Sequence, residues 1–135
     1  MKLLLLLKNY IKLNPKIGYY ELVKIFGLPI NELLNLLGIK KYEIYDNCIK
    51  IFNKKRNLIK IEFSDGELWY YKYDKNGNMI SWKDSYNEWA KWEHDNNGNV
   101  IYFENSHGFW EKYDEKSNCI YSEVSYGYKN KYLLK

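Results

Sequence analysis

A motif that opens on serine recurs four times in the second half of the chain, at intervals of 21, 21 and 19 residues. Its copies begin at Ser64, Ser85, Ser106 and Ser125. The first three copies continue with a Trp, a Lys, an Asp and an Asn-containing turn, and a second alternating segment follows each turn. Such a period indicates a repeated supersecondary unit, and the alternation identifies that unit as a β-hairpin. Because a lone hairpin is only marginally stable in water, the hairpins must pair side by side or stack.

The charge and the spacing of apolar residues both change before this repeat. Residues 1–63 carry 12 Lys and Arg against 5 Asp and Glu, and residues 64–135 carry 9 against 12. Apolar residues follow helical spacing before about residue 40 and strand alternation after it. We therefore predict an α+β protein, with a helical head and basic β-hairpin over 1–63 and an antiparallel β-meander of aromatic hairpins over 64–135. The two parts form either one packed unit or two domains.

Three short helices are predicted in the head, over residues 3–11, 19–26 and 30–37. Gly27 ends the second helix, because glycine suits the residue that follows a helix. The second and third helices resemble a helix-turn-helix, in which apolar residues bury a seam between the two helices. The apolar residues that carry this resemblance are Leu22, Val23, Phe26, Leu28, Leu33 and Leu36. Any tightly connected helix pair needs much the same pattern, so a DNA-reading role is one alternative among others.

Two alternating segments follow, over residues 48–52 and 58–63, and a Lys-rich turn joins them. Together with the helices they resemble a winged helix, whose hairpin tip contacts phosphate. The residues predicted to bind nucleic acid are Lys40, Lys41, Lys54, Lys55, Arg56 and Lys60. The alternative is that these cations keep the hairpin soluble and prevent pairing between strand edges. A winged-helix-like regulator that binds DNA or RNA is thus one candidate function.

The hairpin motif resembles the YD repeat of Rhs-type proteins, which has the form Gly-x4-Tyr-x-Tyr-Asp-x2-Gly-Asn/Arg-Leu. The residues of the first copy that follow this order are Gly66, Tyr71, Tyr73, Asp74, Gly77, Asn78 and Met79. Later copies keep the Asp and alter the aromatic residues. The resemblance covers residues 64–127 and implies the hairpin architecture alone, since an Rhs shell needs very many units to enclose a toxin.

Residues 66–84 are also similar to the choline- or glucan-binding repeats of bacterial surface proteins, in which aromatic residues cage a choline or stack on a sugar. That resemblance implies a carbohydrate- or choline-binding module that works outside the cell. The apolar run at residues 3–7 is shorter than the ~7–15 residues of a secretory signal, however. No segment approaches the roughly 18 apolar residues of a membrane span. We therefore expect a cytoplasmic protein without a membrane contact, located in the host cytoplasm if a phage encodes it.

Groups that support catalysis or metal binding are scarce. His94 and His107 lie inside the repeat units, and Cys48 and Cys119 lack both CxxC spacing and a nearby cluster of His. The sequence has no Gly-rich phosphate loop and no motif of paired catalytic carboxylates. We expect no enzymatic activity, no cofactor and no metal, with both cysteines reduced.

Aromatic residues make up 19% of the chain, and exposed aromatic side chains dominate many protein interfaces. The residues predicted to contact a protein partner are Trp69, Tyr71, Trp89, Trp92, Trp110 and Tyr121. The alternative for each Trp is packing within the sheet or against the helices. Lys, Asn, Ile and Tyr supply 64 of the 135 residues, which is typical of A/T-rich genes in low-GC bacteria, their phages and their mobile elements.

These observations favour a non-enzymatic accessory protein of a phage or mobile element. Such a protein would bind and inhibit a host protein, for example a nucleic-acid-targeting defence enzyme, as small anti-CRISPR proteins do. The winged-helix-like regulator and the carbohydrate- or choline-binding module are the two alternatives. The sequence determines neither the partner nor the oligomeric state.

Overall fold

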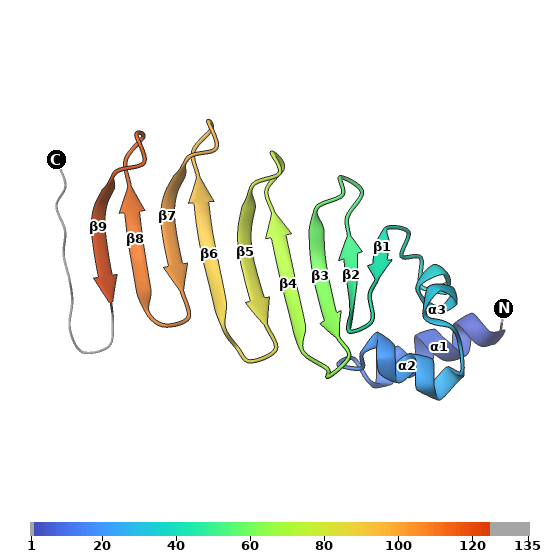
Figure 1. Cartoon of the computed structure of the whole chain (residues 1–135). Helices are drawn as coiled ribbons and strands as arrows, with labels where there is room; N and C mark the ends of the chain where they lie inside the picture. Colours follow the sequence, from blue (N-terminus) through green and yellow to red (C-terminus); the bar gives the residue numbers. More distant parts are fainter. Residues whose placement is uncertain (1, 125–135) are drawn as a thin grey trace. The chain divides into compact units, whose positions relative to one another are not determined.

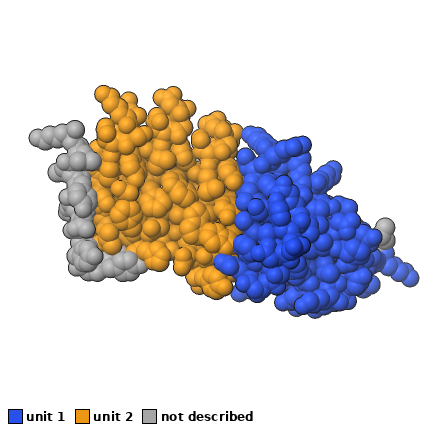
Figure 2. All heavy atoms as spheres, in the orientation of Figure 1, with its two compact units in different colours: residues 1–67 blue, residues 68–135 orange. Residues whose placement is uncertain are grey.

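The structure, a computed structural model, describes residues 2–124 of the chain (Figure 1). The chain divides into two compact units, residues 1–67 and 68–135 (Figure 2). The first unit contains α1 (Lys2–Leu13), α2 (Tyr19–Phe26), α3 (Ile30–Leu36), β1 (Tyr42–Ile44), β2 (Cys48–Phe52) and β3 (Leu58–Phe63). The second contains β4 (Leu68–Tyr73), β5 (Met79–Asp84), β6 (Trp89–His94), β7 (Val100–Asn105), β8 (Phe109–Tyr113) and β9 (Cys119–Val124). The fourth copy of the serine motif, which begins at Ser125, lies outside the described residues.

The predicted α+β class with a winged-helix-like head is wrong, because antiparallel strands predominate in the described chain. The three helices have only 12, 8 and 7 residues. Ile49 and Ile51 of β2 are buried together with Leu34 of α3. The strands of the first unit therefore contribute to its core, whereas a wing would be an accessory hairpin on a helical domain.

The helices lie where the apolar spacing predicts them. Leu7, Leu22 and Leu33, one from each helix, are buried and form one cluster. Gly27 follows α2 in the left-handed conformation with φ 63°, and its N–H donates to the carbonyl of Val23 at 2.9 Å. Glycine adopts this conformation without a steric penalty, so it allows the tight connection between α2 and α3.

A buried carboxylate from β3 caps the N-terminus of α2. Glu62 is 2% exposed, and its two oxygens accept the N–H groups of Tyr19 at 2.9 Å and Tyr20 at 3.0 Å. The first N–H groups of a helix have no partner inside the helix, and the helix dipole favours a negative charge beside them. Gly18 precedes α2 and has no side chain to cap it. Glu62 therefore supplies the cap and ties strand to helix.

In the second unit, each strand pairs antiparallel with the next strand along the chain, from β4 to β9 (Figure 1). Turns over residues 74–78, 95–99 and 114–118 join β4 to β5, β6 to β7 and β8 to β9. Each turn begins with an Asp whose Oδ1 accepts the N–H groups of the residues two and four positions later, all at 2.9 Å. The hairpins that the repeat predicts are thus present in the described residues.

The same turn also joins β2 to β3 in the first unit. Asn53 Oδ1 accepts the N–H groups of Lys55 at 2.9 Å and Asn57 at 3.0 Å, and the N–H of Arg56 donates to the carbonyl of Asn53 at 2.9 Å. The structural repeat therefore begins one hairpin earlier than the sequence analysis places it. The signal that was overlooked is the Asn that ends every copy of the turn, at Asn57, Asn78, Asn99 and Asn118.

Acid is expected to destabilise the turns of the second unit through Asp74, Asp95 and Asp114. Hydrogen bonds from backbone N–H groups, above all that of the Asn four residues later, hold the pKa of each carboxyl below its ordinary value of 3.8. A carboxyl with a lowered folded pKa stabilises the fold above its unfolded pKa, and this contribution is lost as the pH falls through the folded pKa. The free energy of unfolding should therefore decrease below about pH 4.

Asn53 shows how to design the control, because it holds the sister turn with a neutral amide oxygen. The triple variant D74N/D95N/D114N should fold and should lose the part of the acid dependence that these three carboxyls cause. Urea unfolding below about pH 4 and at neutral pH measures this dependence through Trp fluorescence, since all five Trp belong to the second unit. An acid dependence identical to that of the native chain would contradict the expectation.

Candidate functional site

The strand register distributes the side chains of the second unit over two faces of a sheet. Residues directly opposite each other in paired strands share a face. Trp82 lies opposite Tyr71 and Ala90, and Trp92 lies opposite Phe103. One face, named here the aromatic face, therefore carries Trp69, Tyr71, Trp82, Trp92, Phe103 and Phe109.

The rings of the aromatic face form two groups. The Trp69 and Trp82 rings stack with centroids 4.9 Å apart. The Phe103 ring lies 5.4 Å from the Trp92 ring and 6.1 Å from the Phe109 ring. Contacts at these distances stabilise aromatic pairs and fix their orientation. The two groups thus form an ordered apolar surface.

Both faces of this sheet remain partly open to solvent. Within residues 68–124, only Asp84, Ala90 and Ser122 are buried. All five Trp are partly buried, since neighbouring rings and strands cover them only in part. The sheet therefore presents aromatic side chains that its own described residues do not cover.

Two carboxylates, Asp84 and Glu111, belong to the aromatic face, and both accept hydrogen bonds from other residues of the second unit. Asp84 Oδ1 accepts the N–H groups of Tyr86 at 2.9 Å and Glu88 at 3.0 Å. Glu111 accepts a hydrogen bond from the hydroxyl of Tyr113 at 2.8 Å and from the thiol of Cys119 at 3.2 Å. The aromatic face is thus apolar in its centre, with its charges held by turn and cross-strand bonds.

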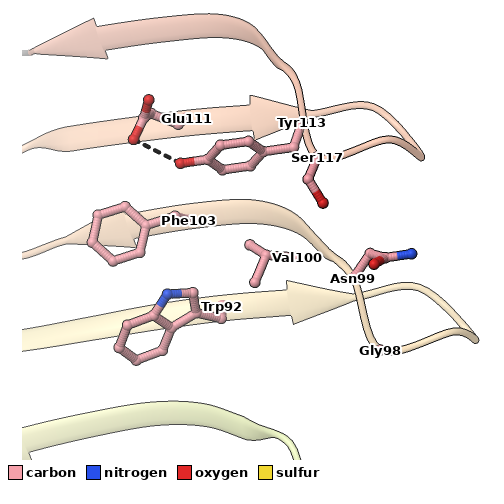
Figure 3. A pocket seen from close by; sticks show the side chains of 8 residues that line it. All are labelled: Trp92, Gly98, Asn99, Val100, Phe103, Glu111, Tyr113 and Ser117. Carbon is pink, nitrogen blue, oxygen red and sulfur yellow. Dashed lines mark hydrogen bonds between the residues drawn. The ribbon is translucent and has the colours of Figure 1, made fainter.

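A hollow of about 560 Å³ lies on this face beside Glu111 (Figure 3). The residues that line it are Trp92, Gly98, Asn99, Val100, Phe103, Glu111, Tyr113 and Ser117. Burial, followed by the hydrogen bond to Glu111, raises the pKa of Tyr113 and of Cys119. Both groups therefore stay protonated at neutral pH, and a protonated thiol is a poor nucleophile. The hollow offers contact surface and hydrogen-bonding groups without an activated nucleophile.

The opposite face, named the lysine face, alternates cations with aromatic rings. Lys83 Nζ lies 5.6 Å from the centre of the Tyr70 ring, and Lys91 Nζ lies 4.9 Å from that of Trp89. Lys72, Lys83, Lys91 and Lys112 all belong to this face, together with Glu93, Glu104 and Glu123. The charged side chains keep this face hydrated.

The structure separates the six residues predicted to contact a protein. Trp69, Tyr71 and Trp92 belong to the aromatic face, whereas Trp89, Trp110 and Tyr121 belong to the lysine face, where Trp110 and Tyr121 stack at 4.5 Å. Trp82, Phe103 and Phe109 also belong to the aromatic face and were not predicted as contact residues. Alternation along each strand contained this signal, but only the register shows which alternate positions share a face.

A second hollow, of about 340 Å³, lies in the first unit and is named the basic hollow. The residues that line it are Lys40, Lys41, Tyr42, Glu43, Phe52 and Arg56. Lys41 Nζ donates a hydrogen bond to the carbonyl of Lys54 at 2.8 Å. This bond connects the residue that precedes β1 to the β2–β3 turn. The fold thus gathers three of the six cations predicted to bind nucleic acid.

The other three predicted cations lie elsewhere in the first unit. Lys54 and Lys55 are exposed in the β2–β3 turn. Lys60, on β3, places its Nζ 4.3 Å from the centre of the Tyr19 ring, and burial lowers its pKa. Lys60 therefore contacts the start of α2 and is not part of the basic hollow.

The search for similar proteins finds no family model that matches the chain and no curated protein that matches it. Within residues 2–124, no group of three or more His, Cys, Asp or Glu residues is placed to hold a metal ion. No helix in the same range is both long enough and apolar enough to cross a membrane.

Proposed function

We propose that the protein is a non-enzymatic binding protein whose aromatic face covers an apolar surface of a protein partner. The observation that supports this most strongly is the segregation of side chains across the sheet. Every Lys of β4–β9 belongs to the lysine face, and both carboxylates of the aromatic face are engaged within the fold. Aromatic enrichment and depletion of charge distinguish the cores of protein interfaces from ordinary surface.

The free-energy cost of desolvation favours the aromatic face over the lysine face as the surface that contacts the partner. Burying the lysine face would desolvate several Lys and Glu side chains, and a partner would have to pair each of them. The aromatic face needs only apolar cover over Trp69, Trp82, Trp92 and Phe103. Its stacked rings are held in place before binding, so little conformational entropy is lost. The partner surface that fits it is therefore apolar and poor in charge.

The class of partner that we propose is a nucleic-acid-targeting host enzyme, which the protein would inhibit by binding. An inhibitor of this kind needs a contact surface and no reactive group. The aromatic face provides such a surface, and the raised pKa of Cys119 keeps its thiol unreactive.

Two Trp residues of strand β6 allow a matched test. Trp92 belongs to the aromatic face and Trp89 to the lysine face, and both are partly buried. A partner captured from nuclease-treated host lysate is titrated against each variant by calorimetry. Trp92→Ala should weaken binding by about 30-fold, the effect of a hot-spot residue. Trp89→Ala should change it by less than about threefold, because this side chain faces away from the contact.

Three results would contradict this proposal. The first is a failure to recover any saturable protein partner, and the second is a larger loss for Trp89→Ala than for Trp92→Ala. The third is a dimer in light scattering that Trp92→Ala converts to a monomer, since the face would then bind a second copy. Circular dichroism of both variants confirms that each remains folded.

A further inference from the structure

Arg56 occupies a left-handed backbone conformation in which two other copies of the turn have glycine. Its φ is 64°, in the left-handed region. The equivalent positions of the other copies are Gly77 and Gly98, with φ of 86° and 84°, and Ser117, with φ of 66°. Glycine adopts this conformation freely, whereas a residue with a Cβ does so only at a cost in conformational energy. The turn would therefore form more easily with glycine at position 56.

The side chain of Arg56 lines the basic hollow together with Lys40 and Lys41. The hollow contains one carboxylate, Glu43, whose Oε1 already accepts the hydroxyl of Tyr45 at 2.5 Å. Three cations against one carboxylate leave the hollow with a net positive charge. Such a site attracts an anion, and a planar guanidinium matches the oxygens of a phosphate in a bidentate geometry.

Solubility alone does not explain a cation at this strained position. Lys54 and Lys55 are exposed in the same turn, and neither has a positive φ. They already supply the charge that discourages pairing between strand edges. Strained backbone is often found at binding sites, and Arg56, unlike Lys54 and Lys55, both has a positive φ and lines the basic hollow.

Aromatic residues beside these cations indicate which class of anion the basic hollow would bind. Tyr42 and Phe52 line the basic hollow, and the hydroxyl of Tyr42 donates to Asn35 Oδ1 at 3.2 Å, which orients its ring. Proteins that bind single-stranded nucleic acid combine cations for the backbone with aromatic rings on which bases stack. A duplex keeps its bases stacked on one another and would leave these rings unused.

We propose that the basic hollow binds single-stranded nucleic acid, with Arg56 as the principal phosphate contact and Lys40 and Lys41 beside it. This site lies in the first unit and is independent of the aromatic face, so its failure would leave the proposed function untouched. The contact is to phosphate and to the face of a base, and it therefore predicts little preference for base sequence.

Arg56→Gly separates binding from folding, because glycine suits the turn. The full chain is titrated into a fluorescently labelled oligothymidylate, and anisotropy reports binding over a range of salt concentrations. Arg56→Gly should weaken binding by about tenfold and reduce the slope of log K against log salt by about 0.7, the value for one lost phosphate contact on a single strand. Its melting temperature should equal or exceed that of the native chain.

Two further variants keep the test independent of any change in the turn. Lys40→Ala removes a second cation of the hollow and should also weaken binding, and it leaves the bond from Lys41 Nζ to the carbonyl of Lys54 in place. Lys116→Ala is the matched control, because Lys116 occupies the position of Lys55 in the turn that joins β8 to β9. It should leave the affinity within about twofold of the native value, because Lys116 belongs to the second unit and does not line the basic hollow.

Four results would overturn the inference. They are the absence of saturable binding to the oligothymidylate, an affinity unchanged by Arg56→Gly, and tighter binding to a duplex than to the single strand. The fourth is binding of polyglutamate with the same dependence on Arg56 and equal affinity. That result would assign the hollow to an acidic protein segment.

Discussion

Glu62→Ala is expected to lower the free energy of unfolding of the first unit by about 3 kcal/mol, the combined effect of losing a helix cap and two charge-assisted hydrogen bonds. The substitution leaves the N–H groups of Tyr19 and Tyr20 without their acceptors at the start of α2. It also removes a negative charge beside the half-buried ammonium of Lys60. No side chain at Gly18 can replace the cap.

Far-UV circular dichroism measures this loss during urea unfolding, because the three described helices all belong to the first unit. Glu62→Gln is the matched control: it retains one acceptor oxygen and the size of the side chain, and it should cause a smaller loss. Trp fluorescence reports the second unit in the same samples. Equal stability of Glu62→Ala and the native chain would show that the cap contributes nothing.

Gly18→Ala should destabilise the first unit by about 2 kcal/mol, a typical cost of overpacking a filled site. A Cβ at this position would lie 2.6 Å from Glu62 Oε2 and 2.9 Å from its Cδ. The backbone itself is not the obstacle, since φ −90° and ψ 168° suit any residue. The carboxylate cannot move aside without breaking its bonds to α2.

Combining Gly18→Ala with Glu62→Ala tests whether the clash causes the loss of stability, because Glu62→Ala removes the carboxylate that the new Cβ would meet. In the Glu62→Ala background, Gly18→Ala should be neutral or should stabilise by up to about 1 kcal/mol, as a Gly to Ala change does where the backbone allows it. A double-mutant cycle from urea unfolding gives the coupling between the two residues. Additive effects would mean that the clash is relieved by other movements.

The sequence predicts individual elements well because their signals are local. The bounds of α2, and the strands β2 and β3, follow from apolar spacing and from Gly27 and the Lys-rich turn. The short strand β1, Tyr42–Ile44, was not predicted, since three residues carry too little periodicity. The fold class was wrong because spacing does not show how much of the core each element forms. Only packing shows that Ile49 and Ile51 share a core cluster with Leu34.

The sequence did not reveal which aromatic residues share a face, because the spacing between the opening serine and the Trp differs by one residue among the copies. Trp69 follows its opening serine by five residues, whereas Trp89 and Trp110 follow theirs by four. A shift of one position moves a side chain to the opposite face of a sheet. Trp residues that the motif matches to one another therefore lie on different faces, and grouping them by the motif mixed two surfaces.

The turn between β2 and β3 was predicted, but it was not recognised as a copy of the repeat, for a related reason. Prediction looked for Asn-Gly, which marks positive φ, and position 56 holds an arginine instead. The hydrogen bonds of Asn53 and the pairing of β2 with β3 impose the conformation that the residue itself disfavours. The basic hollow could not be foreseen as a group either, because it depends on where that turn places Arg56.

Every strand of the second unit pairs with its neighbour along the chain, and this affects how the unit folds. Contacts between strands span few residues, so bringing them together restricts only short loops and costs little chain entropy. Folding of the second unit can therefore start at any of its hairpins and extend to the neighbouring hairpins in both directions. Hairpins that pair in this way can be added or lost in evolution without rebuilding a distant core.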